Sequence, residues 1–206
     1  MIKKRLGWVT AVGLGAIAAM SSGSAYAQAG PRVLLASING QDYQSIMQIA
    51  PQSAEDYYNQ GIVLQGRGQV EAAIEKFSQA LALEPDNADY TFSRGLAYAD
   101  RGDIDHAIQD YSRAIALDSN LTSAYYNRGL ALFSLHRLND AINDFSAALS
   151  IDSGFIAAYY SRGMAYYDQG KLQLARQDYN QAKSLNPQIS EAFYDKGFIR
   201  PLVGGD

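Results

Sequence analysis

Residues 54–87 read AEDYYNQGIVLQGRGQVEAAIEKFSQALALEPDN, and the pattern of this stretch returns three more times along the 206-residue chain. One glycine recurs every 34 residues, at Gly61, Gly95, Gly129, Gly163 and Gly197. Counting this glycine as position 8 divides the sequence into units 54–87, 88–121, 122–155 and 156–189, followed by a fragment from 190 to about 200. A fixed period of this length predicts a stack of repeats in which each unit packs on its neighbours.

Several other positions keep the same register. Alanine fills positions 20 and 27 in all four units, and position 24 is always aromatic: Phe77, Tyr111, Phe145 and Tyr179. Small residues at positions 8, 20 and 27 allow two helices to approach closely, and the ring at position 24 fills the space between them. Position 15 is Gly68, Gly102, His136 and Gly170, residue types that tolerate the left-handed backbone of a helix end. Each unit is therefore predicted to form a helix A, a short turn and a helix B.

The first unit carries Tyr57, Gly61, Leu64, Ala73, Phe77, Ala80 and Pro85. This pattern resembles the tetratricopeptide repeat family, and the resemblance covers residues 54 to about 200. It implies an all-α, right-handed superhelical solenoid of four helix-turn-helix repeats with a C-terminal capping helix. It also implies that the A helices line a concave groove that receives a peptide or helix of a partner protein. The chain departs from the family at Thr91, where an aromatic residue is usual, and at Ser119 and Ser153, which replace the closing proline.

The resemblance places positions 2, 5, 6, 9, 12 and 13 of helix A on the concave side. The residues predicted to bind a partner there are Tyr58, Asn59, Ile62, Phe92, Leu96, Tyr126, Asn127, Leu130, Phe133, Tyr160, Met164 and Tyr167. Aromatic and aliphatic side chains favour an amphipathic helix or an apolar peptide, and asparagine amides can bind a peptide backbone.

Two features qualify this predicted site. An alternative role for the rings at position 5 is packing between adjacent A helices, so Phe133 and Tyr167 at position 12 are the better candidates for exposure. Family members that grip a C-terminal carboxylate use basic and asparagine side chains where this chain has Tyr58, Ile62, Ser123 and Asn127. That clamp is absent.

The two ends of the chain differ from the repeats. Residues 1–27 combine Lys3, Lys4 and Arg5 with an apolar run and end in Ala25-Tyr26-Ala27, the order of a cleavable secretory signal. The alternative, an uncleaved anchor, needs roughly 20 apolar residues, more than this run supplies. Removal of residues 1–27 takes away three positive charges and changes the net charge from −4 to −7.

Residues 28–53 form a leader, interpreted as flexible or as containing a short helix at 45–49. At the other end, Arg176 and Lys183 replace apolar residues on helix B of the fourth unit, as expected for the last unit of a solenoid. Residues 190–200 are predicted to form the capping helix, and the tail continues to residue 206.

A polar pair recurs at positions 7 and 23. The pairs are Arg94 with Asp110, Arg128 with Asp144 and Arg162 with Asp178, whereas the first unit has Gln60 and Lys76. We interpret them as ion pairs between helices A and B of one unit, the alternative being two independent surface preferences. Bridging to the preceding unit is the less favoured arrangement. Partly exposed pairs of this kind are worth at most about 1 kcal/mol each.

Composition excludes several classes of function. There is no cysteine, which removes disulfides, thiolate metal sites and a cysteine nucleophile, and the acidic balance disfavours a nucleic-acid partner. The two histidines, His106 and His136, belong to no metal-binding or catalytic motif, and none of the common nucleotide or hydrolase motifs occurs.

We therefore expect no enzyme activity, cofactor or metal site, and no membrane span in the mature form. The predicted function is that of a protein-binding scaffold or assembly adaptor, exported to the periplasm or an equivalent lumen. The alternative is a non-catalytic regulatory subunit of a cell-envelope enzyme complex.

Overall fold

The computed structural model describes residues 53–187, and within them the chain forms helices and no strand. The helices are α4 (Ala54–Gly66), α5 (Val70–Leu83), α6 (Ala88–Arg101), α7 (Ile104–Leu117), α8 (Thr122–Ser134), α9 (Leu138–Ile151), α10 (Ile156–Asp168) and α11 (Leu172–Leu185). The A helices of the four units are α4, α6, α8 and α10, and the B helices are α5, α7, α9 and α11. The predicted all-α repeat architecture is confirmed.

Local side chains set several of the helix ends. Ser53 accepts a hydrogen bond from the amide of Asp56, whose carboxylate accepts one from the Ser53 amide, so α4 begins with a capping box. The side chains of Asn87 and Asp103 likewise accept hydrogen bonds from backbone amides and cap the N-terminal ends of α6 and α7. The turns between helices A and B pass through positive φ at Gly68 (74°), Gly102 (85°), His136 (60°) and Gly170 (74°). The left-handed turn predicted at position 15 is therefore present in every unit.

Helices A and B of each unit are in very close contact at the recurring glycine. A Cβ atom placed on Gly61 would lie 2.6 Å from the ring of Phe77, and the three equivalent distances are 2.7–2.8 Å. Contacts this short are essentially never found for a real Cβ atom, so no larger residue fits without a shift. Phe77 and Phe145 are completely buried, and the alanines at positions 20 and 27 are at most 2% exposed. The packing role predicted for these positions is confirmed.

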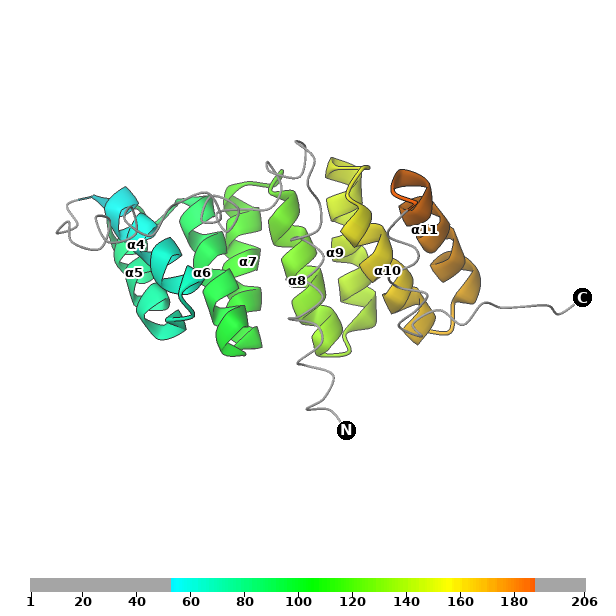
Figure 1. Cartoon of the computed structure of the whole chain (residues 1–206), viewed down its shortest axis with the longest axis horizontal. Helices are drawn as coiled ribbons and strands as arrows, with labels where there is room; N and C mark the ends of the chain where they lie inside the picture. Colours follow the sequence, from blue (N-terminus) through cyan, green and yellow to red (C-terminus); the bar gives the residue numbers. More distant parts are fainter. Residues whose placement is uncertain (1–52, 188–206) are drawn as a thin grey trace, which may run out of the picture.

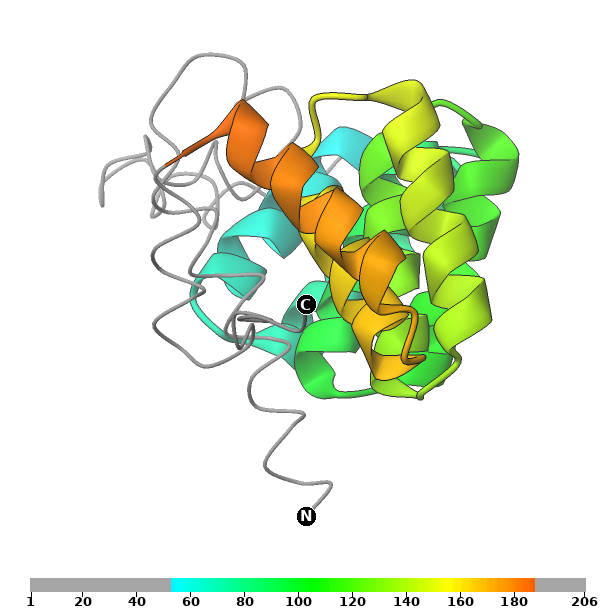
Figure 2. The ribbon, with the colours of Figure 1, turned by 90° about the vertical axis from the view of Figure 1, so that its right-hand side faces the viewer.

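The repeats follow one another along the long axis of the molecule in chain order (Figure 1). Each helix packs against the helices before and after it, and the apolar core is a series of small clusters between them. Neighbouring A helices also contact one another, at α4–α6, α6–α8 and α8–α10. Viewed along the array, successive helix pairs turn about its axis (Figure 2). Together these contacts describe a solenoid whose A helices are the more closely packed layer.

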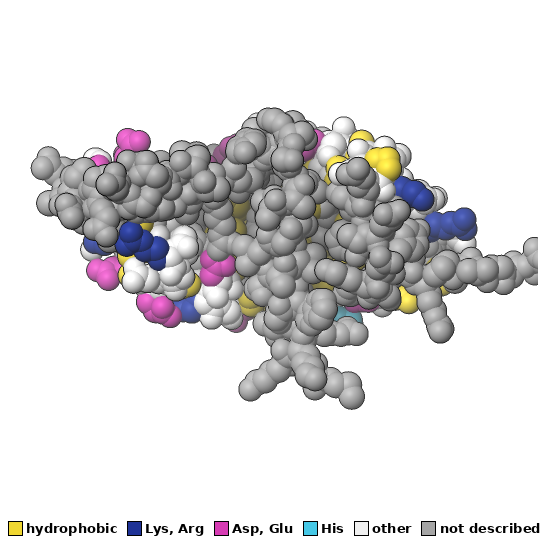
Figure 3. Space-filling view, in the orientation of Figure 1, with side chains coloured by type: hydrophobic (Ala, Val, Ile, Leu, Met, Phe, Trp, Pro, Cys, Tyr) yellow, Lys and Arg dark blue, Asp and Glu magenta, His cyan; other side chains and the backbone are white. Residues whose placement is uncertain are grey.

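The C-terminal end of the described array is polar. Arg176 and Lys183 are exposed on α11, as predicted for the last repeat, and Lys and Arg side chains are visible at the right-hand end of Figure 3. Leu172 and Leu174 on the same helix are 39% and 40% exposed. This helix therefore buries less apolar surface than its counterparts in the earlier repeats.

Several predictions fall on residues outside the described range. They are the signal peptide (1–27), residues 28–52 of the leader with its possible helix at 45–49, and the capping helix and tail (190–206). Within residues 53–187, no helix has the length and apolarity that crossing a bilayer requires.

Candidate partner-binding site

The candidate site is the face that the A helices present at positions 2, 5, 6, 9, 12 and 13, which we call the A face. These positions recur at intervals of three or four residues, so they fall along one side of each helix. Because the A helices contact one another, the four strips form one continuous surface from α4 to α10. All twelve predicted binding residues belong to this surface, but the structure buries them to very different degrees.

The rings at position 5 lie deep in the A face. Phe92 and Tyr160 are 4% and 7% exposed, and each packs against the position 24 ring of its own repeat, with centroid distances of 5.7 Å and 5.1 Å. Tyr58 and Tyr126 are half-buried and make the same contact with Phe77 and Phe145, both at 5.8 Å. The position 5 rings thus pack on helix B of their own repeat. Tyr58 also stacks on Tyr90 of the next A helix at 4.7 Å, and Tyr126 packs on Phe155, just before α10, at 4.8 Å, so the alternative of packing between adjacent A helices is present as well.

The hydroxyl groups of the position 5 tyrosines are also engaged. The Tyr58 hydroxyl lies 3.4 Å from Ser93 Oγ, and the Tyr126 hydroxyl lies 3.4 Å from Ser161 Oγ, each in the next repeat. Burial raises the pKa of both phenols above its ordinary value. These two hydroxyls link neighbouring A helices.

Position 6 supplies one exposed amide and one that is hydrogen-bonded within its own helix. Asn59 is exposed on α4. Asn127 donates through Nδ2 to the Ser123 carbonyl at 2.8 Å, within its own helix. Asn59 is therefore the amide better placed to reach a peptide backbone.

Position 9 forms a semi-exposed apolar strip. Ile62 is buried at 7% exposure, while Leu96, Leu130 and Met164 are partly buried. Leu96 and Leu130 pack on the clusters beneath them through part of their surface. The strip therefore becomes more open after the first repeat.

Position 12 changes character along the array. In α4 it is Gln65, which is buried and donates to Asp100 Oδ2 at 2.7 Å, and in α6 it is Ala99. Phe133 in α8 is partly buried against a cluster that includes Leu132. Tyr167 in α10 is 50% exposed. The open aromatic surface of the A face is therefore concentrated in the last two repeats.

The predicted ion pairs are present in repeats two to four. Arg94, Arg128 and Arg162 each hold the carboxylate of the aspartate 16 residues later through Nε and Nη2, with distances of 2.7–2.8 Å. This hydrogen bonding raises the pKa of each guanidinium. The aspartate side chains are only 7–9% exposed, so the pairs are more buried than expected.

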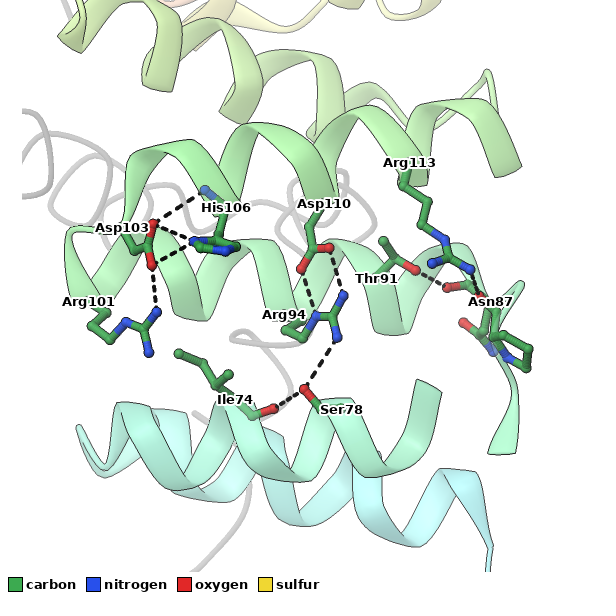
Figure 4. Close-up of polar contacts among 11 residues, drawn as sticks. Ile74, Ser78, Asn87, Thr91, Arg94, Arg101, Asp103, His106, Asp110 and Arg113 are labelled. Atoms are coloured by element: carbon green, nitrogen blue, oxygen red, sulfur yellow. Dashed lines mark hydrogen bonds and ion pairs between the residues drawn. The ribbon is translucent and has the colours of Figure 1, made fainter. Parts of the chain in front are cut away.

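Each of these arginines also reaches the preceding repeat. Nη1 of Arg94 donates to Ser78 Oγ at 3.3 Å, and Arg128 and Arg162 donate in the same way to Ser112 and Ser146 at 3.0 Å. Ser78 in turn donates to the Ile74 carbonyl one helical turn earlier (Figure 4). The link between repeats that the sequence disfavoured therefore exists, through a serine rather than through a charge. These serines recur at position 25, a column that the sequence analysis did not single out.

In the first repeat, a different residue places its positive charge over the position 4 ring. Lys76 of α5 places its ammonium group 5.3 Å from the ring of Tyr57, where Arg128 and Arg162 lie 5.7–5.8 Å from the equivalent rings of Tyr125 and Tyr159. A cation thus covers the position 4 ring in each case, supplied by helix B in the first repeat and by helix A in the third and fourth. This explains why positions 7 and 23 change together in the first unit.

A second polar cluster surrounds the turn of repeat two. His106 stacks on Tyr98 and places Nδ1 2.9 Å from the Asp103 carboxylate, which also binds Arg101 at 2.6 Å (Figure 4). The histidine, and then the arginine, lower the pKa of Asp103 to about 2. His106 is exposed, and within residues 53–187 no three His, Asp or Glu side chains are grouped to hold a metal ion. This cluster caps α7 and is separate from the A face.

Comparison with known proteins identifies the repeat. A family model described as TPR repeat matches residues 66–100, 95–136 and 129–170, and one described as tetratricopeptide repeat matches residues 156–189. A search of curated protein sequences gives no significant match.

The similar solved structures include several of the protein MamA. One crystal structure of MamA is 27% identical, with a TM-score of 0.66, over 73% of this chain and 88% of the MamA chain. A second, also 27% identical, has a TM-score of 0.64 over 73% of this chain and 82% of that chain. MamA from Desulfovibrio magneticus RS-1 is 19% identical over 76% of this chain and 90% of that chain, and its TM-score of 0.68 shows a likeness of fold.

Proposed function

The chain belongs to the tetratricopeptide repeat family of protein-interaction scaffolds, and we propose that it binds a segment of a partner polypeptide along its A face. In this function the helices provide a binding surface, and the chain carries out no catalytic step. The segment would make its apolar contacts on α6, α8 and α10, where position 9 and position 12 side chains are partly or fully open.

The observation that carries this proposal is the exposure of Tyr167. Half of this side chain is open to solvent, although Gln65 and Ala99 at the same position in other repeats show that packing does not require a ring there. A large aromatic side chain exposed without a structural need is typical of binding hot spots. Met164, one helical turn earlier, and Phe133 in the preceding repeat extend this apolar surface.

Photo-cross-linking tests the proposal directly. A photoreactive phenylalanine analogue at Tyr167 is expected to cross-link a partner in extracts, because it lies on the open part of the A face. The same analogue at Asn143, an exposed position on the B helix α9, serves as the control and is expected to give no such product. Equal cross-linking from both positions would place the binding surface elsewhere.

Identification of the captured protein separates the two forms of the proposal. A peptide or helix donor at variable stoichiometry supports an assembly adaptor. One enzyme captured at fixed stoichiometry supports the alternative, a non-catalytic subunit of an envelope enzyme complex.

We also propose export, because residues 1–27 have the order of a signal peptide. The mature chain would begin at Gln28 and work in the periplasm or an equivalent lumen. Intact-mass measurement of the exported protein checks this, and a membrane-bound species that retains residues 1–27 would contradict it.

A further inference from the structure

Every charged side chain of the A face is acidic. Among positions 2, 5, 6, 9, 12 and 13 of α4, α6, α8 and α10, four residues are carboxylates and none is lysine or arginine: Glu55, Asp89, Asp100 and Asp168. Three of the four arginines on these helices are bound to the aspartates of position 23, and the fourth, Arg101, binds Asp103 at a turn. The arginines within these four helices are thus engaged in ion pairs beside the A face.

Two of the carboxylates stand out. Glu55 and Asp89 are exposed at position 2 of α4 and α6, two helices in contact. Within residues 53–187, neither accepts a hydrogen bond or forms an ion pair. Burial raises the pKa of Tyr90, and the negative charges of Glu84, Glu55 and Asp89 add to that shift, so both carboxylates act on one site. Among the described residues, this end of the A face therefore carries two negative charges that no ion pair neutralises.

The other end of the A face carries less charge and more open aromatic surface. Position 2 is Ser123 in α8 and Ala157 in α10, and position 12 supplies the rings of Phe133 and Tyr167. Only Asp168 brings a carboxylate to the A face in these two repeats. The surface thus runs from acidic at α4–α6 to aromatic and aliphatic at α8–α10.

We propose that the A face takes a cationic polypeptide segment in one fixed orientation. Lysine or arginine side chains of the segment would lie against Glu55 and Asp89, and its aromatic or aliphatic side chains against Tyr167 and Phe133. This inference rests on the proposed function and narrows the class of partner. Complementary charge speeds association and excludes acidic segments, while the apolar end supplies most of the affinity.

Helix electrostatics alone also favours acidic residues at these sites. Glu55 and Asp89 are the second residues of α4 and α6, where a carboxylate interacts well with the helix dipole. Glu71 and Asp105 occupy the same place in the B helices α5 and α7 of the same two repeats, outside the A face. All four are exposed. Glu71 and Asp105 are therefore a matched control with the same helix position and the same charge.

The experiment selects binders from a displayed library of random 16-residue peptides, with the folded protein as bait. Wild type is expected to enrich peptides of net positive charge in which basic residues are separated from an aromatic or aliphatic group. For a selected peptide, E55K/D89K is expected to raise Kd about tenfold or more, whereas E71K/D105K changes it less than about twofold. The wild-type Kd is expected to rise about tenfold between 50 and 300 mM NaCl.

The outcomes separate the two levels of the proposal. Enrichment of neutral or acidic peptides, or equal losses in E55K/D89K and E71K/D105K, overturns the cationic partner and leaves the A face as a binding surface. Enrichment that is unchanged by Y167A overturns the A face itself. Failure to enrich any peptide on wild type counts against both. Melting curves of all variants exclude loss of fold as the cause.

Discussion

A methyl group added to Gly129 would lie 2.7 Å from Cε1 of Phe145, a side chain with no exposed surface. Because the ring cannot move aside in a filled core, G129A is expected to lower the stability by about 1–3 kcal/mol, although alanine favours a helix more than glycine does. Urea denaturation measures the change. In G129A/F145L the smaller side chain removes the clash, so the double variant should lose less than the sum of the single losses. A G129A protein more stable than wild type would show that the helices can separate freely.

The pair Arg128–Asp144 is expected to matter more for stability than a surface ion pair. Asp144 is 5% exposed, and R128A leaves its charge buried without the guanidinium, at a cost of about 3 kcal/mol. R128M/D144L replaces both members by apolar groups and should lose less than R128A alone. Denaturation of the three proteins tests this, and 1 M NaCl should change the difference little. If R128A lowers the stability by less than about 0.5 kcal/mol, the pair contributes no more than an exposed salt bridge does.

Replacing His136 by glycine is expected to increase the stability of the protein. Its φ of 60° is the left-handed conformation that glycine adopts at this position in the other three repeats. H136G should therefore raise the stability by up to about 1 kcal/mol. The reverse change, G102A, should cost a similar amount, because nothing lies within 4 Å of the added Cβ and only the backbone opposes it. Thermal unfolding of both variants decides the point, and a lower melting temperature for H136G would show that the imidazole makes a stabilising contact.

The lowered pKa of Asp103 predicts that the stability of the folded chain decreases at low pH. Its pKa is lowered from 3.8 to about 2 when the chain is folded, first by the bond from His106 and then by that from Arg101. The folded state thus favours the ionised form, so the stabilisation is complete above about pH 4 and is lost as the pH falls toward 2. Carboxyl-detected NMR should find the Asp103 midpoint near 2 in wild type and closer to 3.8 in H106A. A wild-type midpoint near 3.8 would rule out the interaction.

Replacing Tyr167 and replacing Phe133 by alanine should affect binding and stability differently. Y167A is expected to weaken binding of the captured partner by about 2 kcal/mol or more and to leave the melting temperature nearly unchanged, because the ring is half exposed. F133A should weaken binding and also reduce stability, because Phe133 packs on the cluster around Leu132. Isothermal titration and circular dichroism report the two quantities. A large fall in melting temperature for Y167A would make this ring part of the core.

The repeat period made the fold and the ion pairs predictable from the sequence. Four copies of one unit show which positions are restricted. The restrictions at Gly129 and Phe145 indicate close packing of two helices, and the joint change at positions 7 and 23 favoured an ion pair for Arg128 over an independent surface preference. The depth of each side chain on the A face was not predictable in this way. Phe92 and Tyr167 share a helix face, but only the contact with helix B decides that Phe92 is buried on Tyr111 while Tyr167 stays open.

The contacts between repeats could not be predicted from the sequence either. Ser78 is an ordinary residue within its own unit, and its bond from Arg94 depends on the angle at which the next repeat packs. No pattern within a single unit encodes that angle. The link became visible only when both repeats were placed together.

The serine that receives each arginine has a consequence for how the gene of such a chain can change in length. If residues 122–155 were deleted, Arg162 would meet Ser112 instead of Ser146, with its own Asp178 still beside it. Recombination that adds or removes one interior unit therefore leaves no buried charge without its partners. The first unit supplies Ser78 to Arg94, but it has Gln60 and Lys76 in place of the arginine and the aspartate, so it has no arginine of its own to reach a preceding unit. The bonds that join the repeats thus make the interior units interchangeable, while the first repeat only receives such a bond.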